Sequence, residues 1–138
     1  MARRISMTVD TGAIAVDILD VDGSKVGELE FNPADLSIVS RYEEVVDRLN
    51  ALKYDEEEGF EAAKKMETAI KEQLDYLLCC DASKGVFSKY SPLAVKEDGD
   101  FFFEGVFEGV AKLIEEYTST RLEAKLAKVR KVTEKYTK

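Results

Sequence analysis

The chain has 138 residues, of which 45% are hydrophobic and 35% charged, and its formal net charge is −8. This length suits one folded domain, and the composition is too apolar for a disordered chain and too charged for a membrane protein. The sequence contains no histidine, which excludes nucleophile–histidine relays and histidine-bound zinc or iron. These features predict a soluble binding protein rather than an enzyme, with no catalytic residue, cofactor or metal ion.

Charge is divided unevenly along the chain. Residues 1–120 contain 13 basic and 26 acidic side chains, whereas residues 121–138 contain 7 basic and 2 acidic side chains. We therefore expect a single acidic domain over 1–120 and a basic helical extension over 121–138. No apolar run reaches the roughly 18 residues of a membrane span or opens the chain as a signal peptide, and the adjacent pair Cys79-Cys80 fits a reducing compartment. The expected location is cytoplasmic, without a membrane partner.

Two runs of alternating apolar and polar residues flank Asp22-Gly23, one over 13–21 and the other over 25–31. Asp-Gly between two such runs predicts a β-hairpin over 13–31. Val26, Leu29 and Phe31 form its expected inward set. Residues 5–10 are a candidate third strand.

The segment Asn32-Pro33-Ala34-Asp35 combines a capping residue, a proline and a first-turn acid, which predicts a helix start. Apolar residues at three- and four-residue spacings extend this helix to about Lys53. The predicted apolar stripe consists of Leu36, Val39, Tyr42, Val46, Leu49 and Leu52.

A second helix is predicted from about Asp55, its expected cap, to Cys80. Turn residues between Asp81 and Gly99 then predict an ordered loop anchored by Val86, Phe87, Tyr90 and Leu93. The predicted apolar stripe of this helix consists of Phe60, Ala63, Met66, Ile70, Leu74, Leu77 and Leu78.

A third helix is predicted from Asp100 to about Tyr117, and no proline interrupts the sequence beyond it. Apolar residues continue at helical spacing into the basic extension, which is expected to project beyond the core. The whole pattern predicts an α+β fold that is mainly α: an N-terminal hairpin packed on a bundle of three helices, with a long C-terminal helix. The stripe of the extension consists of Leu122, Leu126, Val129, Val132 and Tyr136.

Three groups of residues have alternative interpretations. Asp20, Asp22 and Ser24 resemble the start of a calcium loop, but the glycine is misplaced and the later bidentate glutamate is absent, so we predict no metal site. Cys79-Cys80 ends an apolar stripe and lacks a histidine neighbour, which favours buried packing over reactivity. Three consecutive aromatics at 101–103 cannot all point inward from a helix, so at least one should contact a loop or a partner.

Four segments together resemble one known family. They are Leu29-Glu30-Phe31-Asn32-Pro33-Ala34-Asp35-Leu36, Gln73-Leu74-Asp75-Tyr76-Leu77-Leu78-Cys79-Cys80, Lys84-Gly85-Val86-Phe87 and Phe102-Phe103-Glu104-Gly105-Val106-Phe107-Glu108. In this order, over roughly residues 25–120, the chain resembles the tail assembly chaperones of long-tailed, siphovirus-like bacteriophages and related prophages.

The resemblance implies a non-enzymatic protein that binds and solubilises the tape measure protein while the tail tube assembles around it. It implies action in the bacterial host cytoplasm, absence from the mature virion, contacts with the tape measure protein and the tail tube protein, and self-association. Expected partner contacts are Phe101, Phe102, Val106 and Phe107, followed by Arg121, Lys125 and Lys128 of the basic extension.

Two other classes of function fit parts of the pattern. The acidity of residues 1–120 would suit a phage-encoded inhibitor that mimics DNA toward a host defence nuclease, and it disfavours nucleic acid as a ligand of the basic extension. Carboxylate pairs such as Asp17 with Asp20 would be needed for a hydrolase, but no pocket motif accompanies them. Another phage structural or interaction protein is the remaining alternative.

Overall fold

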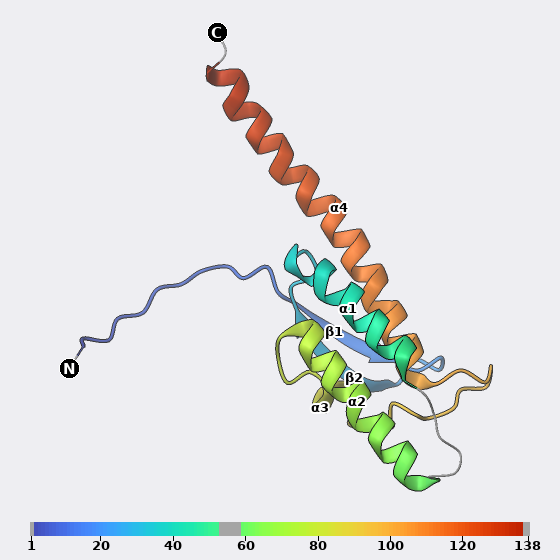
Figure 1. Ribbon diagram of the computed structural model, residues 1–138. Helices are drawn as coiled ribbons and strands as arrows, with labels where there is room; N and C mark the ends of the chain where they lie inside the picture. Colours follow the sequence, from blue (N-terminus) through green and yellow to red (C-terminus); the bar gives the residue numbers. More distant parts are fainter. Residues whose placement is uncertain (1, 53–58, 137–138) are drawn as a thin grey trace.

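The computed structural model describes residues 2–52 and 59–136, with only the helical backbone for 132–136. Figure 1 shows a β-hairpin covered by helices, with two segments that leave the body: the N-terminal residues and the C-terminal half of the last helix. The mainly helical α+β fold predicted from the sequence is confirmed. Its elements are β1 Ile14–Leu19, β2 Lys25–Phe31, α1 Ser37–Ala51, α2 Phe60–Leu78, α3 Ser83–Val86 and α4 Phe102–Tyr136.

The hairpin predicted over 13–31 is confirmed as the antiparallel pair β1-β2. The turn forms because the Asp22 carboxylate accepts hydrogen bonds from the Ser24 N–H at 2.9 Å and the Ser24 hydroxyl at 2.6 Å, while Gly23 adopts a φ of +88°. These bonds from Ser24 lower the pKa of Asp22. The register shifts beside Ile18, which pairs with Gly27, so β2 contains one extra residue there.

The candidate third strand over 5–10 is wrong for the described chain, because residues 2–13 form no strand. The sheet of the described residues therefore has two strands. The outer edge of β2 is covered by a helix. The short helix α3, within the predicted loop, packs against β2. A Cβ atom on Gly27 would lie 2.6 Å from the Val86 carbonyl oxygen, and one on Gly85 would lie 2.6 Å from the Glu28 carbonyl oxygen. Two glycines thus allow this backbone contact.

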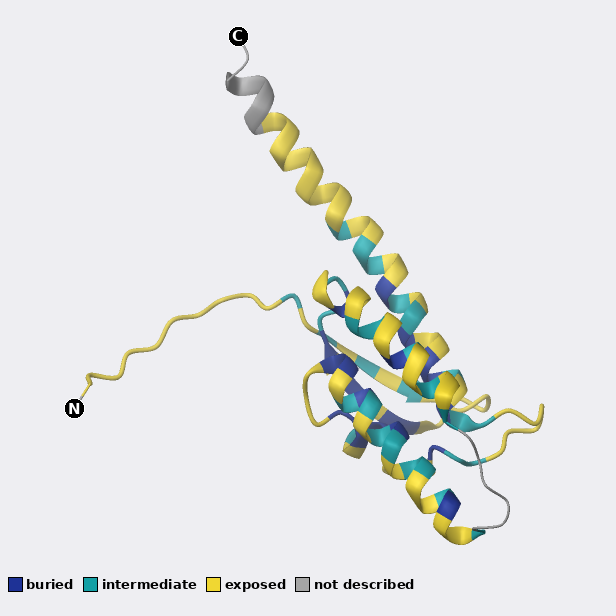
Figure 2. Ribbon diagram, viewed as in Figure 1, coloured by how far each residue is buried: buried dark blue, intermediate teal, exposed yellow. Residues whose placement is uncertain are grey.

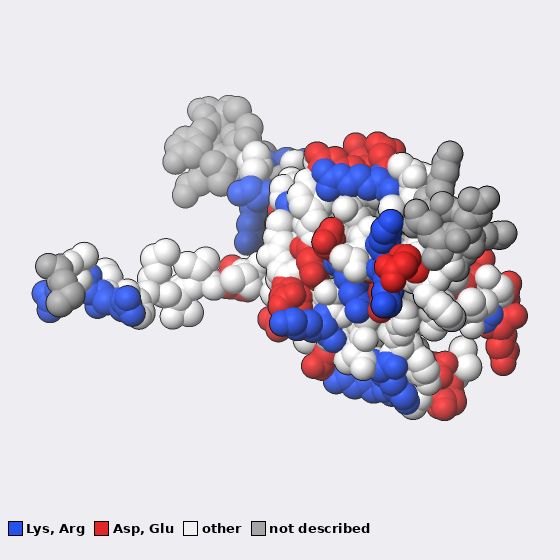
Figure 3. Space-filling view, turned by 60° about the horizontal axis from the view of Figure 1, so that its bottom comes forward, with Lys and Arg blue, Asp and Glu red and all other residues white. Residues whose placement is uncertain are grey.

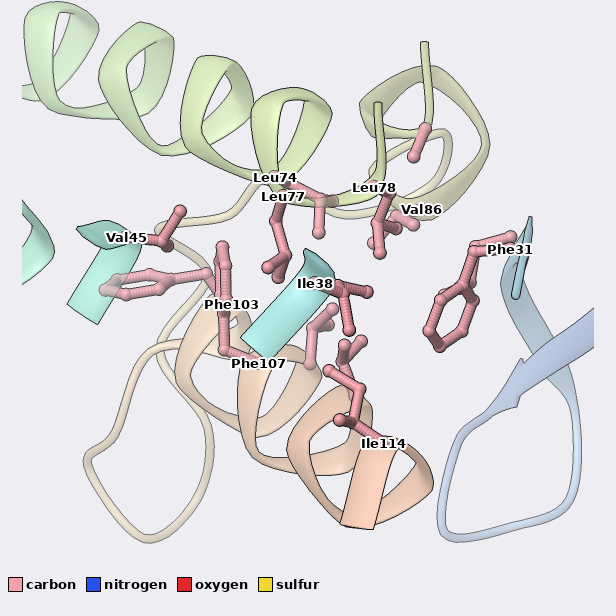
Figure 4. Close-up of a cluster of buried hydrophobic side chains, with 14 of the residues drawn as sticks. Phe31, Ile38, Val45, Leu74, Leu77, Leu78, Val86, Phe103, Phe107 and Ile114 are labelled. Carbon is pink, nitrogen blue, oxygen red and sulfur yellow. The ribbon is translucent and has the colours of Figure 1, made fainter. Parts of the chain in front are cut away.

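The hydrophobic core lies between the inner face of the hairpin, α1, the C-terminal half of α2 and the first turns of α4. Val26, Leu29 and Phe31 are buried as predicted. Figure 4 shows side chains from all these elements converging on Ile38 of α1. The other labelled members of the cluster are Phe31, Val45, Leu74, Leu77, Leu78, Val86, Phe103, Phe107 and Ile114.

Helix α1 begins four residues later than predicted. The Asn32 side-chain oxygen accepts a hydrogen bond from the Ala34 N–H, and the Asp35 carboxylate accepts one from the Ser37 N–H, so two side chains stabilise turns before the helix. Leu36 therefore precedes the helix and is exposed, as is Val39, and both predicted core positions are wrong. The observed core face consists of Ile38, Tyr42, Val45, Leu49 and Leu52.

The apolar face of helix α2 begins later than predicted, and the helix ends at Leu78, before the two cysteines. The expected cap at Asp55 lies outside the described residues, and Phe60, the first residue of α2, is exposed rather than in the core. At the other end, Cys79 adopts a left-handed φ of +53°, which turns the chain away from the core face. Both Cys79 and Cys80 are exposed free thiols, so the prediction that they are buried is wrong.

Helix α4 runs without interruption from the core into the basic extension (Figure 1). Its first half buries Phe103, Val106, Phe107, Val110 and Ile114 against the other elements. From Leu122 to Lys131 every described residue is exposed, and Figure 2 shows this part of the helix standing clear of the body. Among the described residues, no other helix or strand therefore packs on the C-terminal half of α4.

Candidate partner-binding surface

The four aromatic and aliphatic residues expected to contact a partner occupy two different environments. Val106 and Phe107 are buried in the core, 8% and 6% exposed. Phe101 and Phe102 are half-buried at the start of α4. While α4 remains packed, a partner can therefore contact Phe101 and Phe102 but not Val106 and Phe107.

Phe101 and Phe102 are held by the loop before α4. The Phe102 N–H donates to the Ala94 carbonyl at 2.7 Å, and the Phe101 N–H donates to the Glu104 carboxylate at 3.0 Å. The Phe102 ring lies edge-on to Phe87 and Tyr90, at centroid distances of 6.0 and 6.3 Å. The expectation that one of the consecutive aromatics contacts a loop is thus confirmed, and these rings stabilise the loop as well as facing solvent.

Arg121 anchors α4 to the start of the hairpin. Its guanidinium donates to the Gly12 carbonyl at 2.7 Å and to the Asn32 side-chain oxygen at 3.1 Å, and it lies 5.2 Å from the centre of the Tyr117 ring. Asn32 in turn donates to the Thr11 carbonyl at 2.9 Å. We call these contacts among Thr11, Gly12, Asn32 and Arg121 the arginine clamp. Arg121, expected to bind a partner, is thus already used within the chain.

Beyond the clamp, α4 presents apolar side chains on one face. Leu122, Leu126 and Val129 are 38%, 46% and 47% exposed and follow one another at spacings of four and three. This spacing places them on one stripe, because successive residues of an α-helix are turned by about 100°. We call the exposed side chains of Leu122 and Leu126, with the helix surface between them, the α4 seam.

Basic side chains border the α4 seam on one side. Lys125 and Lys128, both expected to contact a partner, are exposed, and helical geometry places them about 60° and 120° from Leu122 around the axis. The described ion pairs include neither lysine. The projecting segment therefore offers leucines beside positive charge, a combination that suits an apolar helix flanked by acidic residues.

Acidic and basic residues are mixed on the surface of the body. Figure 3 shows both signs interleaved on the face that it turns forward. Lys25 bridges Asp17 and Glu28 across the hairpin at 3.2 and 2.7 Å, and Lys84 pairs with Asp81. The net negative charge of the body is thus not gathered into one uniform acidic face in this view.

A shallow hollow of about 550 Å³ lies between the outer face of the hairpin and the turn after α2. Its lining includes the carboxylates of Asp17, Glu28, Glu30 and Asp81 together with Cys80. Although Cys80 is exposed as a residue, partial desolvation of its thiol, followed by the nearby charge of Asp75, raises the pKa of that thiol. A raised pKa keeps the thiol protonated and weakly nucleophilic at neutral pH, so the hollow lacks an activated nucleophile at this cysteine.

Within residues 2–52 and 59–131, whose side chains the structure describes, no group of histidine, cysteine, aspartate and glutamate side chains is arranged to hold a metal ion. In the same ranges, no helix combines the length and apolar character needed to cross a bilayer. The chain matches no protein-family model, no curated protein and no solved structure.

Two features of the surface were not predicted from the sequence. The arginine clamp joins residues 109 positions apart, Gly12 and Arg121, and no local pattern signals such a pair. The open edge of β1 was not predicted either, because residues 5–10 were a candidate third strand of the sheet. Apolar and polar residues do alternate from Ile5 to Val9, but these residues form no strand with the hairpin of their own chain.

Proposed function

We propose that this protein is a non-enzymatic tail assembly chaperone of a long-tailed bacteriophage or prophage, and that it binds and solubilises the tape measure protein. The observation that carries the proposal is the α4 seam, an exposed apolar stripe on a helix that projects from the folded body. A long helical client exposes apolar stripes until the tail tube encloses it. A projecting helix with a stripe of its own can cover part of such a surface by helix-against-helix packing.

Several features support this proposal. The four segments that resemble tail assembly chaperones include the β2–α1 connection, the end of α2, α3 and the start of α4, all of which build the base from which α4 projects. Lys125 and Lys128 beside the seam would favour a client helix with acidic flanks. The proposal includes transient action in the host cytoplasm, contacts with the tail tube protein and absence from the finished virion.

The nuclease-inhibitor alternative has less support from the surface. A DNA mimic needs a continuous acidic face, because the phosphate backbone that it imitates presents an unbroken row of negative charge. On this body, ion pairs such as Lys25 with Asp17 and Lys84 with Asp81 interrupt the acidic residues. The face shown in Figure 3 has this mixed charge and therefore gives a DNA mimic no support.

Co-expression with the tape measure protein encoded in the same genome tests the proposal. We expect the wild-type chain to keep the client in the soluble fraction. The double variant Leu122→Asp, Leu126→Asp should lose this effect, because charge replaces both leucines of the seam. Ala124→Asp with Ala127→Asp is the matched control, since these exposed residues lie on the opposite side of the helix and receive the same charge.

Two results would count against the proposal. A client equally insoluble with and without the wild-type chain would contradict chaperone activity itself. Equal loss of client solubility in the seam variant and in the control would contradict the assignment of that activity to the seam. Circular dichroism of both variants separates these results from simple unfolding, and both should retain the wild-type spectrum because the four substituted side chains are exposed.

A further inference from the structure

The outer edge of β1 carries backbone groups without strand partners. The Asp20 N–H donates to the Ser24 carbonyl at 2.8 Å, and alternate residues of an antiparallel strand direct their hydrogen-bonding groups the same way. Ile14, Val16 and Ile18 therefore direct theirs to β2. Those of Ala15, Asp17 and Leu19 point away from β2, and among the described residues β2 is the one strand that pairs with β1. Such an edge can accept another strand.

The N-terminal arm, which we define as residues 2–10, has the pattern of a strand but pairs with no described residue. Ile5, Met7 and Val9 are 85%, 88% and 65% exposed, and they alternate with Ser6 and Thr8. An extended chain of this sequence has one apolar and one polar face. Figure 1 shows the arm leaving the body beside the start of β1. Its nine residues are long enough to cover the six of β1.

The arginine clamp fixes where the arm leaves. The Asn32 side chain donates a hydrogen bond to the Thr11 carbonyl, and the Arg121 guanidinium donates one to the Gly12 carbonyl. Gly12 itself has a φ of +72°. To fold back onto the β1 edge of its own chain, the arm would have to reverse direction across the very residues that these bonds hold. The clamp thus presents the arm to another molecule.

We propose that the N-terminal arm of one copy adds as an antiparallel strand to the β1 edge of a second copy, in a reciprocal exchange that forms a dimer. On the inner face of the sheet, the apolar side chains of the arm would extend the half-buried row formed by Ile14, Val16 and Ile18. Reciprocal exchange satisfies both open edges and closes the assembly with two-fold symmetry. The proposal is independent of the proposed chaperone function.

Charge on the outer face of the sheet favours the same occupant. Arg3 and Arg4 give the arm its positive end. The outer face of the hairpin carries Asp17, Glu28 and Glu30, which line the hollow described above, and the single charge of Lys25, paired with Asp17 and Glu28, leaves this group net negative. With Ile5, Met7 and Val9 on the inner face, Arg4 lies on the outer face, on the same side as these carboxylates. A second copy of this chain thus matches the edge in both apolar pattern and charge.

Size-exclusion chromatography with light scattering tests the exchange. The wild-type chain should have twice its 15.5 kDa mass. Ile5→Asp with Met7→Asp should be monomeric, whereas Ser6→Lys with Thr8→Lys, on the polar face of the arm, should stay dimeric. Ala15→Pro removes an N–H from the open edge without touching the ladder to β2 and should be monomeric, whereas Ala15→Thr retains the N–H and should stay dimeric.

Mixing the two monomeric variants identifies the exchange itself. The Ala15→Pro chain retains its arm, and the Ile5→Asp, Met7→Asp chain retains its edge, so an equimolar mixture should form a one-to-one complex. Amide hydrogen exchange should also show Ala15, Asp17 and Leu19 protected in the wild type and unprotected in the arm variant. This measurement decides the outcome alone if Ala15→Pro fails to fold. A monomeric wild type, or protection of these amides in a monomer, would overturn the proposal.

Discussion

The contact between β2 and α3 depends on two glycines, and replacing either should destabilise the fold. A Cβ on Gly85 would lie 2.6 Å from the Glu28 carbonyl oxygen, so Gly85→Ala must move α3 from β2 by roughly 0.8 Å to reach an ordinary 3.4 Å contact. Forcing extra volume into such a packed junction typically costs about 1–3 kcal/mol. Gly27→Ala should behave similarly, because its Cβ would meet the Val86 carbonyl oxygen at 2.6 Å.

Gly109→Ala is the matched control, since nothing lies within 4 Å of its Cβ position on an exposed face of α4. It should raise the free energy of unfolding by about 1 kcal/mol through helix propensity. Urea unfolding measures both effects, and a loss of about 2 kcal/mol should lower the midpoint by roughly 1 M. If Gly85→Ala were as stable as Gly109→Ala, the close backbone contact between β2 and α3 would be refuted.

Three further predictions follow from individual side chains. Arg41→Ala should lower the free energy of unfolding by about 1.5–3 kcal/mol, because the guanidinium, 17% exposed, donates to the Leu77 carbonyl at 3.0 Å. Arg48→Ala, whose side chain is 50% exposed, should cost at most about 1 kcal/mol in the same urea titration. Hydrogen bonds from Ser37 lower the pKa of Asp35, so its stabilising effect is complete above the unfolded value of 3.8 and is lost as pH falls through the lower folded pKa. Asp35→Asn should therefore flatten the stability curve below pH 3.8, and an unchanged slope would contradict this. Because burial raises the pKa of Cys80, the alkylation rate of Cys79→Ser should have its midpoint above pH 9.0, and a midpoint below that value would contradict the environment described for this thiol.

Local sequence signals predicted the elements whose stabilising contacts are local. Asp22-Gly23 identified the hairpin because Asp22 and Ser24 complete the turn within three residues. The start of α1 was predicted too early because Asn32 and Asp35 are both capping residues and each stabilises its own turn. Sequence could not decide between them, since the choice depends on which face of α1 meets the core, and Ile38 rather than Leu36 does so.

Long-range contacts limited what could be predicted from the sequence about the candidate partner-binding surface. The apolar stripe and basic charge at 121–131 correctly indicated that α4 would project, because both properties belong to the helix itself. The burial of Val106 and Phe107 depends on packing against α1 and α2, which the sequence of α4 does not reveal. The role of Arg121 as an anchor depends on Gly12 and Asn32. Arg121 lies in a basic segment, and nothing in that segment indicated that its side chain would form hydrogen bonds within the chain.

We propose that the α4 seam binds the tape measure protein, and size-exclusion chromatography with light scattering on the purified pair tests this proposal most directly. Wild-type chain and client should elute together with a mass above that of either alone, and Leu122→Asp with Leu126→Asp should elute separately from the client. Ala124→Asp with Ala127→Asp should still co-elute. Separate elution of the wild-type chain and the client, or a complex that survives the seam substitutions unchanged, would contradict the claim.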